Sequence, residues 1–268
     1  MQVVGKSKVG RIRSGRRQTG FTLVEMAIVL VVIGLILGAV MIGKDVQRNA
    51  EYVKVKQKFI DQWVVGYNTY DQRTGVVVGD NQTSPRLMVD GANFTSGAAQ
   101  ISGGDMSTVT PPGAICHGSA GPGMTRTMEA ATGYDLRDLM QKAGVTMPPG
   151  RAEGSEDRYV YLDANGNPQE IQVCFQWDKP NDPAGVGNVM VITGLTPDLA
   201  RYLDQSIDGK ADARHGRFRE QGIADNNSAN AEWTLNDTAK YVKTGATNGT
   251  YADENQVATL VAIYKMNQ

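Results

Sequence analysis

The longest uninterrupted apolar stretch of the chain covers residues 21–43 and contains one charged residue, Glu25. A helix rises about 1.5 Å per residue, so a stretch of this length reaches roughly 34 Å. That is enough to cross a hydrocarbon core about 30 Å thick. The pattern therefore predicts a membrane-spanning helix over residues 21–43.

After Gly43 the pattern becomes that of an amphipathic helix, with apolar residues three or four positions apart and lysines between them. We expect the helix to continue over residues 44–73. An apolar stripe at helical spacing is ordinarily core, so this stripe is expected to pack on a globular body rather than to bind a ligand. Its members are Val46, Ala50, Val53, Ile60, Val64 and Tyr67.

Residues 74–268 combine a long glycine-rich connection at 80–133 with short alternating segments that are typical of strands. Strands are expected at 158–162, 171–177, 189–193 and 257–264, the first two forming a hairpin. Short helices are expected at 134–142 and after Thr196, which would cap a helix with Pro197 in its first turn. The predicted fold class is α+β, a long N-terminal transmembrane and amphipathic spine helix packed on an antiparallel β-sheet.

Charge is unevenly distributed along the chain. The whole sequence has 27 Lys plus Arg and 28 Asp plus Glu, yet residues 1–20 contain no acidic residue and six basic ones: Lys6, Lys8, Arg11, Arg13, Arg16 and Arg17. Basic residues beside a span stay on the cytoplasmic side, so the body after the span is expected to be exported. That body and the span hold 21 basic against 28 acidic residues, a net charge of −7, which disfavours nucleic acid as a partner.

Three kinds of N-terminal segment fit a basic head followed by an apolar run: a secretory signal, a twin-arginine signal and a permanent anchor. A secretory core usually has about 7–15 residues, and here the run is longer and is followed by Lys44 and Asp45 instead of small residues. Arg16 and Arg17 lack the phenylalanine and leucine that complete a twin-arginine signal. An ordinary anchor leaves Glu25 unexplained, because an unpaired carboxylate in an apolar medium is costly and needs a partner.

The sequence GFTLVE at residues 20–25 resembles the prepilin motif of type IV pilins and of the pseudopilins of type II secretion and DNA uptake. The shared features are a basic leader ending in glycine, then Phe, Thr, Leu, a small aliphatic residue, Glu and an apolar helix. The resemblance implies that a membrane prepilin peptidase cuts between Gly20 and Phe21 and methylates the new amine of Phe21. It also implies that Glu25 meets the N-terminal amine of a neighbouring subunit when the helices stack in a filament.

The resemblance implies a domain organisation, a location and a set of partners. Residues 1–20 would be the removed leader, 21–43 the transmembrane and filament-core helix, 44–73 its amphipathic continuation and 74–268 a periplasmic or extracellular globular domain. The chain would first cross the inner membrane once, with its C-terminus in the periplasm, and then enter a pilus or pseudopilus. Partners would be the prepilin peptidase, other pilin or pseudopilin subunits and the inner-membrane assembly platform.

Several functions remain open within and outside this family. The length of the chain favours a minor pilin or pseudopilin over a major pilin, and Glu25 argues against the large tip pseudopilin, which usually lacks this residue. An adhesive or DNA-uptake minor pilin is one alternative. A membrane-anchored periplasmic binding module, whose helix never leaves the bilayer, is another.

Cys116 and Cys174 are predicted to form a disulfide, because two cysteines of one exported domain usually pair in an oxidising compartment. Many pilins instead close a loop at their extreme C-terminus. Here 94 residues follow Cys174, so the predicted bridge differs from that loop.

Asp204, Asp208 and Asp212 form an acidic cluster where a predicted helix ends, and two interpretations stay open. The carboxylates could bind calcium, which takes oxygen ligands. The alternative, which we favour, is a solvated helix end offset by Arg214, Arg217 and Arg219. No other cofactor is indicated.

No enzyme signature is present in the sequence. With only two histidines there is no H-E-x-x-H pair, and no phosphate-binding loop ends in Gly-Lys-Ser/Thr. His117 and Ser119 lack the spacing of a nucleophile elbow. We therefore expect a structural protein rather than an enzyme.

Overall fold

The structure of the chain is a computed structural model. The described residues are 20–94, 106–117, 124, 134–164, 166–180, 187–223, 231–233 and 259–266. Apart from Gly20, the predicted leader lies outside them. The chain divides into two compact units, Met1–Val46 and Gln47–Gln268.

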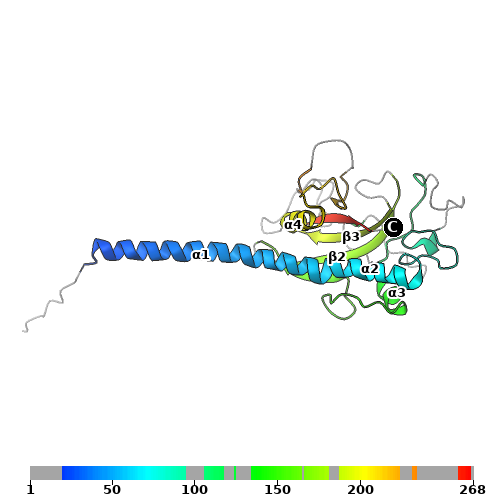
Figure 1. The fold of residues 1–268 in the computed structure, drawn as a ribbon, viewed down its shortest axis with the longest axis horizontal. Helices are drawn as coiled ribbons and strands as arrows, with labels where there is room; N and C mark the ends of the chain where they lie inside the picture. The colour runs from blue at the N-terminus through cyan, green and yellow to red at the C-terminus, as the bar shows by residue number, and fades with distance from the viewer. Residues whose placement is uncertain are drawn as a thin grey trace, which may run out of the picture. The chain divides into compact units, whose positions relative to one another are not determined.

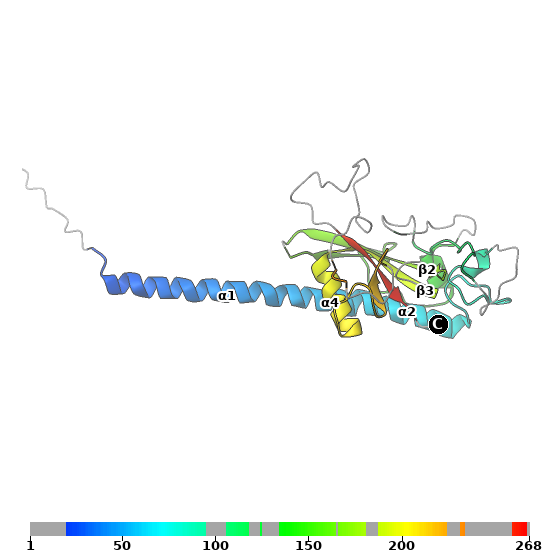
Figure 2. The ribbon, with the colours of Figure 1, turned by 90° about the horizontal axis from the view of Figure 1, so that it is seen from above.

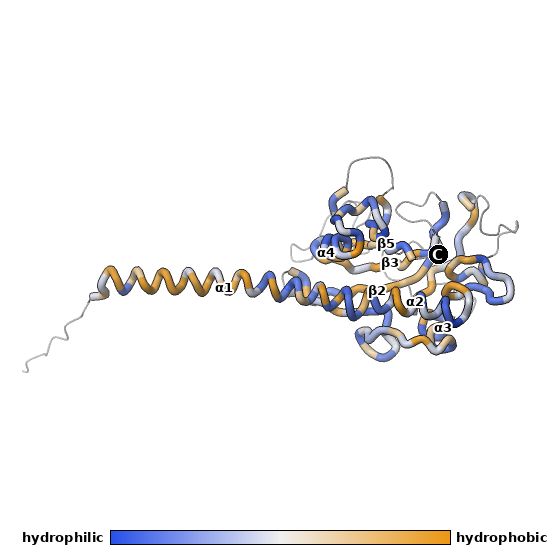
Figure 3. The backbone as a smooth tube through the Cα atoms, in the orientation of Figure 1, coloured by the Kyte–Doolittle hydropathy of each residue, from blue (hydrophilic) through white to orange (hydrophobic). Residues whose placement is uncertain are grey.

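The first unit contains most of the apolar part of helix α1, Leu23–Val55 (Figure 1). Along this part the hydropathy colouring is mostly orange (Figure 3). Its apolar side chains are exposed. The helical run Leu23–Thr74 is long enough, and apolar enough in its first part, to cross a membrane by length and composition. A helix that is apolar on all sides requires either lipid or other helices around it.

In the second unit the spine continues through a π-helix, η1, Lys56–Ile60, and then α2, Asp61–Thr74. In the π-turn the Asp61 N–H donates to the Lys56 carbonyl, five residues back. The Lys56 Nζ also lies 2.9 Å from both Asp61 carboxylate oxygens, a side-chain pair with the same spacing. The wider turn allows the neighbours Phe59 and Ile60 to be buried together.

The spine ends where glycine permits a left-handed turn. Gly75 has a φ of 74° and its N–H donates to the Asp71 carbonyl, which closes the C-terminus of α2. Farther along the chain lie a short 3₁₀ turn, η2, Gly91–Asn93, and two helices, α3, Leu136–Lys142, and α4, Pro197–Asp208.

The two later helices begin at side-chain caps. Thr196 caps α4, as predicted, with its hydroxyl accepting the Leu199 N–H. The prediction that α3 begins at Tyr134 is wrong by two residues, because Asp135 is extended and its carboxylate accepts the Asp138 N–H as the cap.

The sheet has five strands in the order β1-β2-β3-β5-β4, and every neighbouring pair is antiparallel. The strands are β1, Arg158–Leu162, β2, Pro168–Asp178, β3, Gly187–Leu195, β4, Phe218–Glu220, and β5, Leu260–Lys265. The predicted hairpin is present as β1 and β2. Of the predicted last strand, positions 257 and 258 lie outside the described residues.

The core lies between the spine and one face of the sheet (Figure 2). Aromatic side chains form the contact: the Phe59 ring lies 5.3 Å from that of Tyr159, and the Tyr67 ring lies 5.1 Å from that of Phe175. Trp63 approaches Phe175 edge-on at 6.0 Å. A long helix packed on an antiparallel sheet confirms the predicted α+β, pilin-like fold class.

Candidate functional site

The start of α1 is a capping box made by Thr22 and Glu25. Thr22 is the last residue before the helix, and its Oγ1 accepts the Glu25 N–H at 3.2 Å. In return, Glu25 Oε2 accepts the Thr22 N–H at 2.8 Å and the Thr22 hydroxyl at 3.0 Å. Such reciprocal bonds satisfy backbone groups that a helix end otherwise leaves open. The pair therefore defines where the helix begins.

Thr22 belongs to the motif at residues 20–25, yet sequence reasoning gave this residue no role of its own. The signal for one is present in the sequence, because Thr or Ser followed three residues later by Glu before an apolar run is the signature of a capping box. Gly20 and Phe21 precede this cap and lie outside the helix, and the Phe21 side chain is 84% exposed.

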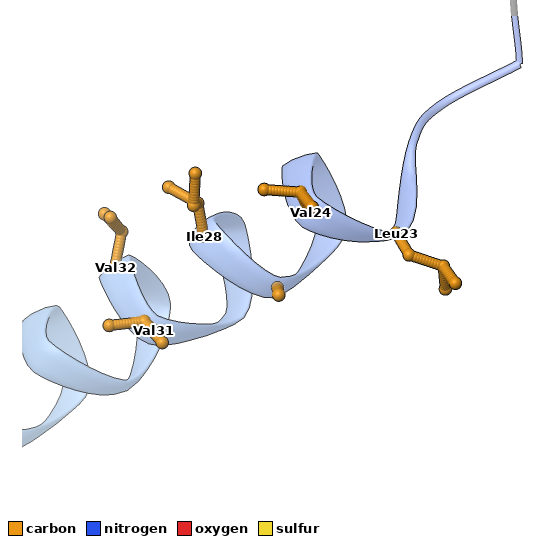
Figure 4. Close-up of a pocket in the computed structure, with 6 residues that line it drawn as sticks. Leu23, Val24, Ile28, Val31 and Val32 are labelled. Carbon is orange, nitrogen blue, oxygen red and sulfur yellow. The ribbon is translucent and has the colours of Figure 1, made fainter.

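The surface that follows the cap is apolar. Leu23, Val24, Ala27, Ile28, Val31 and Val32 line a shallow groove on α1. Val24, Ile28 and Val32 project from the same side of the helix, one turn apart (Figure 4). Glu25 thus stands at the edge of a surface suited to lipid or to another apolar helix.

Only one of the two carboxylate oxygens of Glu25 accepts hydrogen bonds from the described residues. Both of its hydrogen bonds go to Oε2, and within the described residues no hydrogen bond reaches Oε1. In water this oxygen would be solvated, but in an apolar helix bundle it needs a donor or a positive charge. Oε1 is therefore accessible on the exposed start of the helix.

The predicted disulfide between Cys116 and Cys174 is present, with the two Cα atoms 4.8 Å apart and both side chains fully buried. It joins the segment before α3 to the middle of β2, beside a bridge in which Ile115 and Phe175 exchange backbone hydrogen bonds. His117 Nδ1 lies 2.6 Å from Asp135 Oδ2, which ties the same segment to the cap of α3.

The acidic cluster at the end of α4 accepts hydrogen bonds from the turn that follows. Burial is the main cause that raises the pKa of Asp204 to about 7. Asp204 Oδ2 accepts the Asp212 N–H at 2.6 Å and the Trp233 indole N–H at 2.7 Å. Asp208 Oδ2 accepts the N–H groups of Arg217 and Phe218, and Asp212 Oδ1 accepts those of Arg214 and Ala231.

These contacts show that the three carboxylates order the turn between α4 and β4. In the part of the chain that the structure describes, no group of three or more His, Cys, Asp or Glu side chains is arranged to hold a metal ion. Calcium binding by Asp204, Asp208 and Asp212 stays a prediction. Thermal unfolding with and without excess chelator tests it, and an unchanged midpoint would contradict it.

The fold is that of an α+β protein whose N-terminal helix is compatible with membrane anchoring. Comparison with protein families finds the prokaryotic N-terminal methylation motif at residues 15–41. This match supports membership of the type IV pilin and pseudopilin family, whose members are generally structural rather than enzymatic. The motif implies processing by a prepilin peptidase and assembly with other pilins. No curated protein and no solved structure matches the chain.

Proposed function

We propose that this protein is a structural subunit of a type IV pilus or of a type II secretion-like pseudopilus. Within these assemblies it would be a minor pilin or a pseudopilin. A prepilin peptidase cuts it between Gly20 and Phe21 and methylates the Phe21 amine. The observation that carries the proposal is the carboxylate of Glu25, which has an open oxygen on an apolar, exposed helix within the methylation motif.

The physical argument concerns two charges that are each unstable in an apolar medium. A carboxylate and a protonated amine become tolerable there once they pair, because their attraction is strong where the dielectric constant is low. Glu25 of one subunit and the Phe21 amine of its neighbour form such a pair. Extraction from the membrane and the register between subunits then depend on the same contact.

The proposal includes an itinerary for the chain. The basic leader holds the N-terminus in the cytoplasm, so the chain crosses the inner membrane once with its C-terminal unit in the periplasm. From there the assembly platform in the inner membrane adds it to a filament. The filament ends in the periplasm if it is a pseudopilus and outside the cell if it is a pilus.

Mass spectrometry of the protein from cells tests the processing step. The expected N-terminal peptide begins at Phe21 and carries one added methyl group on its amine. Recovery of an intact leader, or of a cut farther along the apolar run, would contradict the proposal.

The variant Glu25→Ala tests the assembly step. We expect it to insert in the membrane in normal amount, since removing a charge only makes the span more apolar, but to be lost from sheared or purified filaments. Glu51→Gln is the matched control, because Glu51 lies outside the apolar run and pairs with Lys54 on the helix surface.

The fractions separate the alternatives. If wild-type protein is processed and stays in the membrane with no filament fraction, the membrane-anchored binding module or a short pseudopilus is favoured over an extracellular pilus. If the Glu25→Ala variant assembles as well as the wild type, the proposed role of Glu25 is wrong.

A further inference from the structure

Strand β4 places an acidic side chain, Glu220, completely inside the second unit. Its exposed fraction is 0%, and within the described residues neither Oε1 nor Oε2 has a hydrogen-bond partner. Alternate residues of a strand share a face, so Glu220 points to the same side as Phe218. The Phe218 ring packs 5.3 Å from Trp233 and 6.3 Å from Tyr264. A carboxyl group thus occupies an apolar, aromatic corner.

The charged side chains of the surrounding elements make their contacts elsewhere. Arg219 points to the opposite face and its Nε donates to the Gly216 carbonyl. Glu232 is exposed. On α4, Asp204 and Asp208 accept the hydrogen bonds described above, and Arg201 donates to the Trp233 carbonyl and pairs with Asp198. Asp212 lies beside His215 and Lys210, and Arg217 donates to the Lys265 carbonyl. Arg214, and Lys265 of β5, have partners as well.

Burial without a partner favours the neutral form of a carboxyl group. Burial raises the pKa of Glu220 from its ordinary value near 4.5 to about 7. The folded corner therefore holds a protonated acid over a range of pH in which an exposed glutamate is ionised.

Backbone hydrogen bonds of Glu220 and of the residue after it hold β4 in place. The Glu220 N–H donates to the Ala213 carbonyl at 2.8 Å, and the Gln221 N–H donates to the Val261 carbonyl of β5 at 2.9 Å. β4 is a three-residue strand at the edge of the sheet, and β5 is its one neighbouring strand among the described residues. Local opening of such an edge exposes Glu220 to water, where it can ionise.

We propose that Glu220 is a proton-sensitive latch, which in its protonated form keeps β4 seated between β5 and residues 209–217 and which loosens this corner when it ionises. The direction of the pH dependence follows from the protonation of Glu220 in the closed and in the open corner. Below about pH 4.5 both the closed and the open corner are protonated, and closure is at its strongest. As the pH rises toward 7 only the open form loses its proton, so opening becomes easier, and above 7 the effect levels off.

Hydrogen exchange of residues 209–223, measured by mass spectrometry on the full chain in detergent, tests the proposal. The variant Glu220→Gln has nearly the same shape and cannot ionise. The opening constant of the wild type, divided by that of Glu220→Gln, is expected to rise about tenfold per pH unit between roughly pH 5 and 7 and then to become flat. This ratio cancels the contribution of Asp204, which both proteins share.

Glu232→Gln is the matched control, since it removes the same charge from an exposed position in the same corner. Its ratio to the wild type is expected to stay flat over the whole pH range. A flat ratio for Glu220→Gln as well would overturn the proposal.

A second measurement applies if Glu220→Gln fails to fold. Isotope-edited infrared spectra of wild-type chain labelled at the glutamate carboxyl carbons are expected to retain the C=O band of one protonated acid at pH 6. Absence of that band shows that the buried glutamate is ionised, and the latch is then refuted.

Discussion

At the scale of single residues, Gly194 shows how one missing side chain allows two strands to meet. It lies at the irregularity in β3 between Ile192 and Leu195, and its φ of 81° belongs to the left-handed region. A Cβ on this residue would collide with the backbone of Glu170 on β2. Its carbonyl also accepts the Tyr161 hydroxyl at 3.0 Å, so the glycine fixes a buried polar contact as well.

We expect Gly194→Ala to lower the free energy of unfolding by about 2–4 kcal/mol, from backbone strain and overpacking together. Gly209→Ala is the matched control, because Gly209 has a φ of 80° but a Cβ added there would meet nothing within 4 Å. The control is expected to cost only about 1–2 kcal/mol. Chemical denaturation of the full chain in detergent measures both, and equal costs would show that the contact with Glu170 is unimportant.

Glu25 could be identified from the sequence, whereas the burial of Glu220 could not. The motif at residues 20–25 identified Glu25, and its Thr-x-x-Glu spacing contained the information for the cap. The burial of Glu220 could not be foreseen, because it depends on Phe218, Trp233 and Tyr264 meeting from separate parts of the chain.

At the scale of elements, strong periodic patterns were predicted correctly and short or irregular elements were missed. The hairpin, the third strand and α4 have clear alternation or clear caps. β4 was missed because its three residues are too few for a pattern. The π-turn at Lys56–Ile60 was missed because one extra residue in a turn changes helical spacing very little, and the backbone hydrogen bond from Asp61 to Lys56 that defines it leaves no sequence signal.

The disulfide is the covalent link between elements, and its removal is expected to lower stability. The bridge closes a separation of 58 residues, so loop-closure entropy predicts a loss of roughly 4 kcal/mol for the double variant Cys116→Ala with Cys174→Ala. Thermal unfolding with the wild type as reference measures the loss.

A control for the disulfide prediction measures whether a reductant can reach the two cysteines. Because both cysteines are fully buried, a mild reductant is expected to leave the folded wild type intact and to act only after denaturant is added. An unchanged melting temperature in the double variant would contradict a stabilising role.

At the scale of the whole molecule, the chain consists of two units with different requirements for their surroundings. The first exposes an apolar helix, while the second, Gln47–Gln268, contains the aromatic core, the sheet and the disulfide. In the sequence, the change from the apolar run to the amphipathic pattern comes after Gly43, close to the boundary after Val46. The order of the strands could not be predicted from the sequence. β5 lies between β3 and β4 in the sheet, and this pairing joins segments that are far apart in the sequence.

We expect a truncated protein that begins at Gln47 to fold without detergent, since most of the exposed large apolar side chains among the described residues lie in the first 46 positions. Gel filtration should give a monomer, circular dichroism should show one cooperative transition, and mass spectrometry should find the Cys116–Cys174 bridge. The full chain without detergent is the control and is expected to aggregate. A truncated protein with no cooperative transition would show that residues 1–46 are needed for folding.

The capping box at the start of α1 has an electrostatic consequence for a processed chain. The N-terminal end of a helix carries a partial positive charge from its aligned peptide dipoles. Cleavage before Phe21 would add a protonated amine at the same end, one residue ahead of Thr22. Glu25, in the first turn, is the negative charge that offsets both. In the proposed filament, the same carboxylate would serve its own helix through Oε2 and a neighbour's amine through Oε1, so that its negative charge would be shared between two subunits.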